Sequence, residues 1–311
     1  ELIYRDVSIG SLWPTPLRPR QRPPALASLL AKNQPNEGTF FMQNVYTSWP
    51  RIRKTEGVVK HLRIVQVLPK TTPHANTPRV GLANASPGKQ VLGTVPVESD
   101  GSAYFRAPAR IPLSFQALDE RGMAIQTMRS LTYLQPGEQA RCVGCHAHHN
   151  AAPPMAKLTL ASRRKPSRIT PGPDGSKPLN YAILVQPILD KHCIKCHGGR
   201  KPDGGIDLTS AAAGQFTRSY NALAPLVPYS EWKGTPQANH EPVTYPNQFG
   251  SRASRLMQLL SAGHERVQLS EKEYRRLITW MDTNALFYGT FDPADQRRQQ
   301  RGERIAGPKL E

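Results

Sequence analysis

Two short stretches of the chain carry the same arrangement of cysteines and a histidine. They read Cys142-Val-Gly-Cys145-His146 and Cys193-Ile-Lys-Cys196-His197, and they contain all four cysteines. Two thiols at this spacing can form thioethers with the vinyl groups of a haem, and the adjoining imidazole can ligate the iron. We therefore predict two covalently bound haem c groups. Their attachment residues are Cys142, Cys145, Cys193 and Cys196, and their first axial ligands are His146 and His197.

Two other uses of paired cysteines fit the sequence less well. A structural zinc site would normally place its second Cys-x-x-Cys nearer the first and would not need a histidine after both pairs. A thioredoxin-type dithiol usually accompanies a strand that runs into a helix, and neither motif has that pattern around it. Because the haem motifs use every cysteine, no disulfide is expected.

Further histidines are candidates for the remaining axial positions or for proton transfer. His148 and His149 follow His146 too closely to reach the opposite face of the same haem without a tight reversal of the backbone. They could ligate a neighbouring haem, bind a metal or move protons, or they could be exposed side chains beside the haem edge. His192, directly before the second motif, has the same ambiguity, whereas His61 and His74 are expected on the surface.

The composition limits the class of protein. The 311 residues suffice for two domains. We predict a soluble, loop-rich protein from the 38% hydrophobic content and the 30 prolines. No apolar run is long enough to span a membrane, so no transmembrane segment is expected. The net charge of +18 favours an acidic redox partner or other cytochrome subunits in a hetero- or homo-oligomeric complex, and no nucleic-acid motif accompanies it. The start at Glu1 without a methionine predicts a mature or excised piece. Covalent haem assembly predicts an extracytoplasmic place, the periplasm of a bacterium.

Periodicity and turn residues predict an α+β fold. Short β-type runs between Val58 and Met128, separated by turns such as Asp100-Gly101, predict a small antiparallel sandwich that resembles prealbumin-like domains and carries the first motif at its end. Five segments are expected. They are an extended arm (1–56), the β-sandwich with haem 1 (57–150), a basic Pro-rich linker (151–178), a helical domain with haem 2 (179–290) and a polar basic tail (291–311).

Helix signals surround the second motif. Asn180 can cap a helix that runs into the motif, and Ser270 with Glu273 forms a capping box before an apolar helical stripe. An attachment helix, a C-terminal helix and a ligand in the loop before it resemble the cytochrome c fold. That resemblance implies His264 opposite His197, which would give a low-potential haem with both axial sites filled. His240 is the second choice for that ligand, and Met257 is more simply a core residue.

Several stretches together resemble one family, the alpha subunit of hydrazine synthase and its relatives. The stretches are Gly57–Ile64, Leu92–Phe105, Phe115–Gly122, Met128–Ser130, Pro136–Glu138 and the first haem motif. The resemblance covers the haem-bearing middle and C-terminal parts of that subunit, and the family's propeller-type domain would lie before Glu1. It implies haem 1 in the position of the synthase's catalytic haem and haem 2 in that of its bis-histidine relay.

One departure from the family bears on the activity. In the synthase a tyrosine shortly after the first motif takes part at the active haem, whereas Ala147–Asn150 contains none, which argues against hydrazine formation. We therefore predict a di-haem electron-transfer protein in a larger redox complex. The alternative is an enzyme with an open site at haem 1 that acts on a small nitrogen compound or peroxide, with haem 2 as electron relay and His148 or His149 moving protons.

Overall fold

The structure, a computed structural model, falls into two compact units, residues 1–33 and residues 34–311. It describes residues 2, 4–8, 10, 13, 15–24, 34–74, 77–145, 152, 155, 157–230 and 244–308. In the first unit, which lies within the expected extended arm, the Trp13 side chain is exposed. All helices and strands of the described residues belong to the second unit. No described helix is long and apolar enough to cross a membrane.

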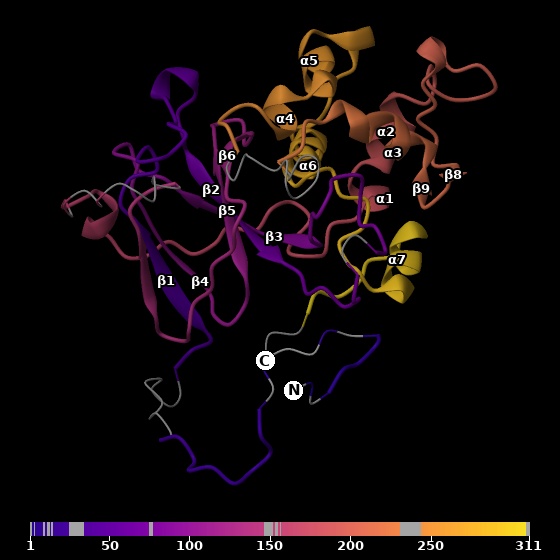
Figure 1. The fold of residues 1–311 in the computed structure, drawn as a ribbon. Helices are drawn as coiled ribbons and strands as arrows, with labels where there is room; N and C mark the ends of the chain where they lie inside the picture. Colours follow the sequence, from indigo (N-terminus) through magenta and orange to yellow (C-terminus); the bar gives the residue numbers. More distant parts are fainter. Residues whose placement is uncertain are drawn as a thin grey trace. The chain divides into compact units, whose positions relative to one another are not determined.

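Two sheets form a sandwich in the second unit (Figure 1). The first sheet has the order β4-β1-β7 and contains β1 (Glu37–Met42), β4 (Ala103–Pro108) and β7 (Gln139–Cys142). The second has the order β3-β2-β5-β6 and contains β2 (His61–Val67), β3 (Lys89–Pro96), β5 (Leu113–Leu118) and β6 (Ala124–Thr127). The predicted α+β content with antiparallel sheets is confirmed. The pairing of β7 with β1 is parallel, which the sequence did not indicate.

Aromatic side chains from both sheets fill the sandwich. Phe115 of the second sheet lies edge-on against Phe40 and Phe105 of the first, with ring centroids 5.0 and 5.7 Å apart. Burying one such side chain contributes about 2–3 kcal/mol to folding. The expected arm therefore ends before residue 37, because β1 alternates half-buried and buried positions and puts Phe40 and Met42 into this core.

The opposite face of the second sheet is polar and lies against the helices. Arg63 donates to Gln116 Oε1 (2.7 Å) and to Asp282 Oδ2 (3.0 Å), and all three side chains are buried. Asp282 Oδ2 also accepts the Ala124 amide, and its Oδ1 accepts the amide and hydroxyl of Ser251. Every charge in this network has a partner, as buried charges require. The network joins the second sheet to the end of α6.

The helical part packs around a cluster of aromatic side chains, Tyr181, Tyr220, Trp280 and Phe287. Its helices are α1 (Tyr181–Leu184), α2 (Gln186–His192), α3 (Arg218–Leu223), α4 (Gly250–Ala253), α5 (Arg255–Ser261), α6 (Glu271–Asp282) and α7 (Pro293–Gln300). The predicted caps are confirmed, since Asn180 Oδ1 accepts the Ala182 amide and Ser270 and Glu273 form the capping box of α6. The helix expected from residue 181 onward is broken at Val185, between α1 and α2.

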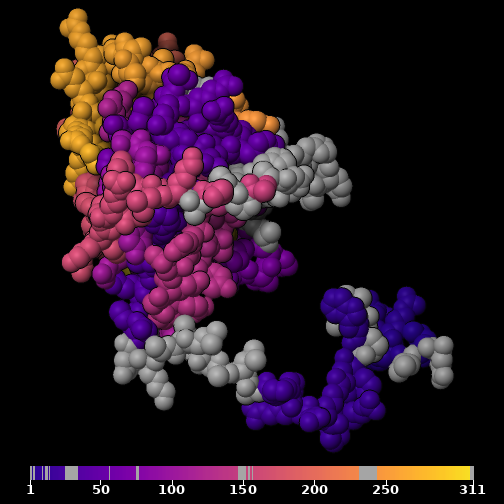
Figure 2. Space-filling model, turned by 90° about the vertical axis from the view of Figure 1, so that its left-hand side faces the viewer, coloured from indigo at the N-terminus to yellow at the C-terminus, as the bar shows by residue number. Residues whose placement is uncertain are grey.

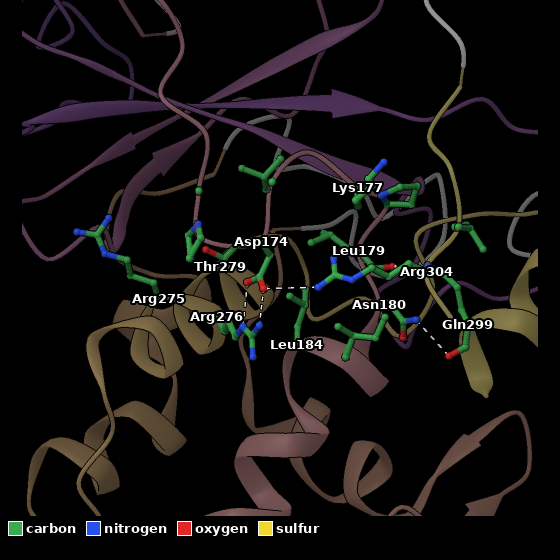
Figure 3. Close-up of a pocket in the computed structure, with 17 residues that line it drawn as sticks. Asp174, Lys177, Leu179, Asn180, Leu184, Arg275, Arg276, Thr279, Gln299 and Arg304 are labelled. Carbon is green, nitrogen blue, oxygen red and sulfur yellow. Dashed lines mark hydrogen bonds and ion pairs between the residues drawn. The ribbon is translucent and has the colours of Figure 1, made fainter. Parts of the chain in front are cut away.

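The segment expected as a linker forms isolated β-bridges with both sheets. Ser167 bridges to Phe105 and Thr170 bridges to Thr94, and in Figure 2 this pink segment crosses the surface of the indigo and magenta strands. Further on, Asp174 accepts two bonds from Arg276 of α6 and lies 3.8 Å from Arg304 (Figure 3). The segment therefore fastens the sandwich to α6 and to the C-terminal residues.

The residues after 290, expected as a polar tail, also pack against the fold. They form α7, whose Gln299 is buried. Gln299 Nε2 donates to the Leu179 carbonyl (2.9 Å), and its Oε1 accepts the Gly289 amide (2.9 Å). The polar composition that suggested a tail therefore reflects amide side chains that bind the backbone.

Candidate cofactor sites

The second motif continues directly from α2. The Cys193 amide donates to the Leu189 carbonyl (2.8 Å) and the His197 amide donates to the Cys193 carbonyl (2.9 Å), so helical hydrogen bonding extends through the motif. Cys193 is half-buried and packs against the helical core, whereas Cys196 is exposed. About one helical turn therefore carries both cysteines and the histidine.

An apolar hollow of about 920 Å³, counting the space at its mouth, lies beside the motif. Its walls come from α2, α5, α6 and the loops between them, and Cys193, Cys196 and His197 line it. Ile206 and Leu259 also line it, although 39% and 40% of their surfaces are exposed. Exposed apolar side chains around a hollow mark a place that a large apolar group can cover.

His264 faces His197 across this hollow. The centroids of the two rings are 6.1 Å apart and the ring planes differ by 25°. A metal–imidazole bond is about 2 Å long, so two imidazoles on opposite sides of one metal have centroids about 6 Å apart. The separation of the His197 and His264 ring centroids matches that distance.

The backbone fixes which nitrogen of His197 can bind a metal. Nδ1 lies 3.2 Å from the Asp203 carbonyl oxygen, which can only accept, so Nδ1 carries the proton and Nε2 keeps its lone pair. His264 follows Gly263, which has φ 86°, and the next two residues also have positive φ. Non-glycine residues in that conformation are strained, and such strain is concentrated at functional sites.

Other side chains at the hollow have different surroundings. His192 lines it, and its Nε2 lies 3.2 Å from Glu273 Oε1. Hydrogen bonds, the largest from Lys191 and others from Ser270 and His192, lower the pKa of Glu273 to about 2. Met257 is buried in the helical core, and His240 lies outside the described residues.

The first motif begins at the end of a strand instead of a helix. Cys142 is the last residue of β7 and pairs with Met42 of β1, and the Gln43 amide donates to the Cys142 carbonyl (2.8 Å). Gly144 lies against the loop after β1, where a Cβ atom would come within 1.9 Å of the Thr47 carbonyl oxygen. Only glycine therefore fits between the two cysteines at this position.

Both thiols of the first motif pack against the sandwich core. Burial raises the pKa of Cys142, and burial together with the neighbouring Cys142 raises the pKa of Cys145 to about 12. Burial also raises the pKa of Cys193 to about 11. Protonated thiols are poor nucleophiles, so these surroundings do not resemble those of a reactive dithiol.

An open hollow of about 1310 Å³ adjoins Cys142. Tyr104 of β4 lines it, and the Tyr104 hydroxyl oxygen accepts a hydrogen bond from Gln139 (3.3 Å). Arg141 and Lys157 also line it and make it basic. The sequence did not single out Tyr104. Its signal was the alternation of β4, which turns Tyr104 away from the core that holds Phe105.

The structure separates the two cysteine pairs and leaves part of the first site undescribed. Cys142 and Cys145 pack on the sandwich core and Cys193 packs on the helical core, so a single zinc site of four cysteines is not formed. All four cysteines are free. His61 and His74 are exposed, as expected. Three candidate residues of the first site lie outside the described residues: His146, His148 and His149.

Comparison with known proteins points to one family. Residues 57–147 match the family described as the hydrazine synthase alpha subunit middle domain. Hydrazine synthase subunit alpha of Kuenenia stuttgartiensis is 24% identical over 238 residues, and the match covers 54% of this chain and 29% of that protein. A solved structure of Kuenenia stuttgartiensis hydrazine synthase matches with a TM-score of 0.53 and 19% identity, over 90% of this chain and 45% of that one. At that identity the structural match shows the fold alone. The chain spans less than half the length of these relatives.

Proposed function

We propose that this chain, which is similar to hydrazine synthase subunit alpha, is a di-haem c-type cytochrome. It transfers electrons between its two haems and a redox partner, as part of a larger complex. The observation that carries the proposal is the pair of facing imidazoles, His197 and His264, across an apolar hollow that holds Cys193 and Cys196. A haem with two imidazole ligands has no open axial site, which favours electron transfer over substrate chemistry.

The residues of the second site fit a haem in donor type, spacing and polarity. Cys193 and Cys196 would supply the thioether sulfurs, and His197 and His264 would supply nitrogens to the iron. When bound, the haem supplies an iron that gains and loses one electron. The Asp203 carbonyl holds the His197 ring in the ligating tautomer, and the apolar walls exclude water from the site.

The first site has the same attachment chemistry in a different setting. Cys142 and Cys145 would hold the haem and His146 would ligate its iron, and an open hollow adjoins Cys142. That hollow favours an alternative function, in which haem 1 acts on a small nitrogen compound or peroxide and haem 2 relays electrons. In that case His148 or His149 moves protons and the Tyr104 hydroxyl offers a further polar group.

The proposal extends to the partners and the place of action. The net charge of +18 and the likeness to a synthase subunit support assembly with an acidic redox protein or with other cytochrome subunits. Covalent haem attachment supports a periplasmic or other extracytoplasmic place in a bacterium. The sandwich is a prealbumin-like domain and the helical part is a cytochrome c-like domain in this account.

Electron paramagnetic resonance of the oxidised protein tests the proposal. Two low-spin signals are expected if both irons have two strong axial ligands, and they support electron transfer. One low-spin and one high-spin signal would favour the alternative, an open site at haem 1. The absence of a low-spin signal with two imidazole ligands would overturn the assignment of the second site.

A further inference from the structure

A third hollow lies on the polar face of the second sheet. It measures about 790 Å³, counting the space at its mouth. Strands β2, β5 and β6 form one wall, the segment before β3 forms another, and the residues that end α6 close it. No cysteine or histidine is among the described residues that line it, so this hollow is separate from both candidate haem sites.

Lys89, the first residue of β3, is the most unusual side chain of this hollow. It is half-buried, and burial lowers its pKa to about 8. No described carboxylate forms an ion pair with its ammonium group, and burial is the single cause of the pKa shift. A partly buried ammonium group without a counter-charge costs free energy, which a bound anion would offset.

Three charged side chains line the described part of the hollow. Among the described lining residues the titratable side chains are Lys89, Arg129 and Asp282. Asp282 is paired with Arg63. Its Oδ2 lies 3.0 Å from the Arg63 guanidinium and 3.0 Å from the Ala124 amide, and its Oδ1 accepts the Ser251 hydroxyl. The Asp282–Arg63 pair is neutral as a whole. The Lys89 ammonium therefore contributes a positive charge to the hollow.

Neutral hydrogen-bonding side chains also line the hollow. The hydroxyls of Ser114 and Ser130 line the hollow and have no hydrogen-bond partner among the described residues. Asn284 at φ 66° closes one side, because its Nδ2 donates to Ser86 Oγ (3.3 Å) and to the Ser230 carbonyl (2.9 Å). Hydroxyls can donate to an oxyanion, so the lining supplies donors in addition to charge.

We propose that this hollow is a binding site for a small oxyanion, held by the Lys89 ammonium and the neighbouring hydroxyls. An ammonium group has three donors and no acceptor, which matches the several acceptor oxygens of a carboxylate or a phosphate. The site joins the sheet to the end of α6, so the bound anion stabilises the contact between the sandwich and the helical part.

Isothermal titration calorimetry of the full haem-loaded chain with inorganic phosphate and with acetate, at constant ionic strength, tests the proposal. At least one of the two should bind, and the stronger one identifies the source of the oxyanion as inorganic or carboxylic. The affinity should fall as the pH rises through about 8, because the Lys89 ammonium loses its proton there. Binding of neither anion more tightly than about 10 mM would overturn the proposal.

Three variants separate the site from a general effect of charge. Lys89→Met should weaken binding at least tenfold, Lys89→Arg should retain it, and Lys60→Met should leave it unchanged, because the Lys60 side chain is exposed. The haem absorption spectrum and circular dichroism report whether each variant folds. If Lys89→Met does not fold, Ser114→Val gives the same test at a neutral position. Equal binding by the wild type and by the folded variants at Lys89 and Ser114 would contradict the proposal.

Discussion

The two cysteine motifs have the same sequence pattern and different structural settings. The second continues a helix, and its hollow has apolar walls and two imidazoles whose centroids are 6.1 Å apart. The first ends a strand, is held by backbone contacts such as that of Gly144 with Thr47, and adjoins a basic hollow that contains Tyr104. Under the proposed function, the motif would attach the haem, and the surrounding fold would determine what its iron can do.

Removing one cysteine pair is the strongest way to test whether the two sites are independent. Cys193→Ser with Cys196→Ser should remove one covalent haem from each chain and leave the haem of the first site, because the pairs pack on different cores. Cys142→Ser with Cys145→Ser is the reciprocal control. Intact mass spectrometry of the denatured protein counts the haems. Loss of both haems from either double variant would contradict independent sites.

Breaking the buried ion pair between Arg63 and Asp282 should destabilise the contact between the second sheet and the helical part. Asp282→Asn leaves Arg63 without its counter-charge in a buried place, and removing one partner of a buried pair costs about 3–5 kcal/mol. Urea unfolding monitored by circular dichroism measures the free energy. Asp295→Asn on α7 is the control, since its pair with Arg298 is partly exposed, and its effect should stay below about 1 kcal/mol. Equal effects of the two substitutions would contradict the role given to Asp282.

A methyl group at Gly144 should damage the first site alone. Its Cβ would overlap the Thr47 carbonyl oxygen, and overpacking of this kind costs about 1–3 kcal/mol. Haem content at the first motif should fall in Gly144→Ala while the second motif stays fully loaded, as peptide mass mapping would show. Gly172→Ala is the matched control, because nothing lies within 4 Å of its Cβ position. Full haem loading at both motifs in Gly144→Ala would contradict this prediction, because the loop that contains Thr47 would then move to accept the methyl group.

Acid should affect the second site through Glu273. Its pKa is lowered to about 2, chiefly by Lys191, so its ionised form stabilises the fold above its ordinary pKa of 4.5, and that stability is lost as the pH falls toward 2. The shift of the urea midpoint between pH 7 and pH 3 should be smaller in Glu273→Gln than in the wild type. Glu120→Gln, at an exposed position, should behave as the wild type does. An unchanged shift in Glu273→Gln would contradict this role.

The sequence predicted local features well because local chemistry determines them. The caps at Asn180 and Ser270 and most of the strands depend on residues close together in the chain, and they are confirmed. The parallel pairing of β7 with β1 joins residues about a hundred positions apart, and no local pattern encodes it. The strand β1 itself follows a proline-rich stretch, which suggested an arm.

The same distinction holds for the candidate sites. The motifs predict the attachment residues and the resemblance to cytochrome c predicts His264 as a ligand, and these stay predictions; the ring centroids of His264 and His197 lie 6.1 Å apart. Tyr104 and Lys89 carry no motif. Their importance comes from the strands that bring Tyr104 beside Cys142 and enclose Lys89 on the polar face of the second sheet.

The most direct test of the central claim is carbon monoxide binding to the reduced His264→Ala variant. If His264 closes the second haem, the variant should bind one more carbon monoxide per chain than the wild type, with both haems still attached. His61→Ala, at an exposed position, should match the wild type. An unchanged carbon monoxide stoichiometry in His264→Ala would contradict the assignment of paired imidazoles to the second site.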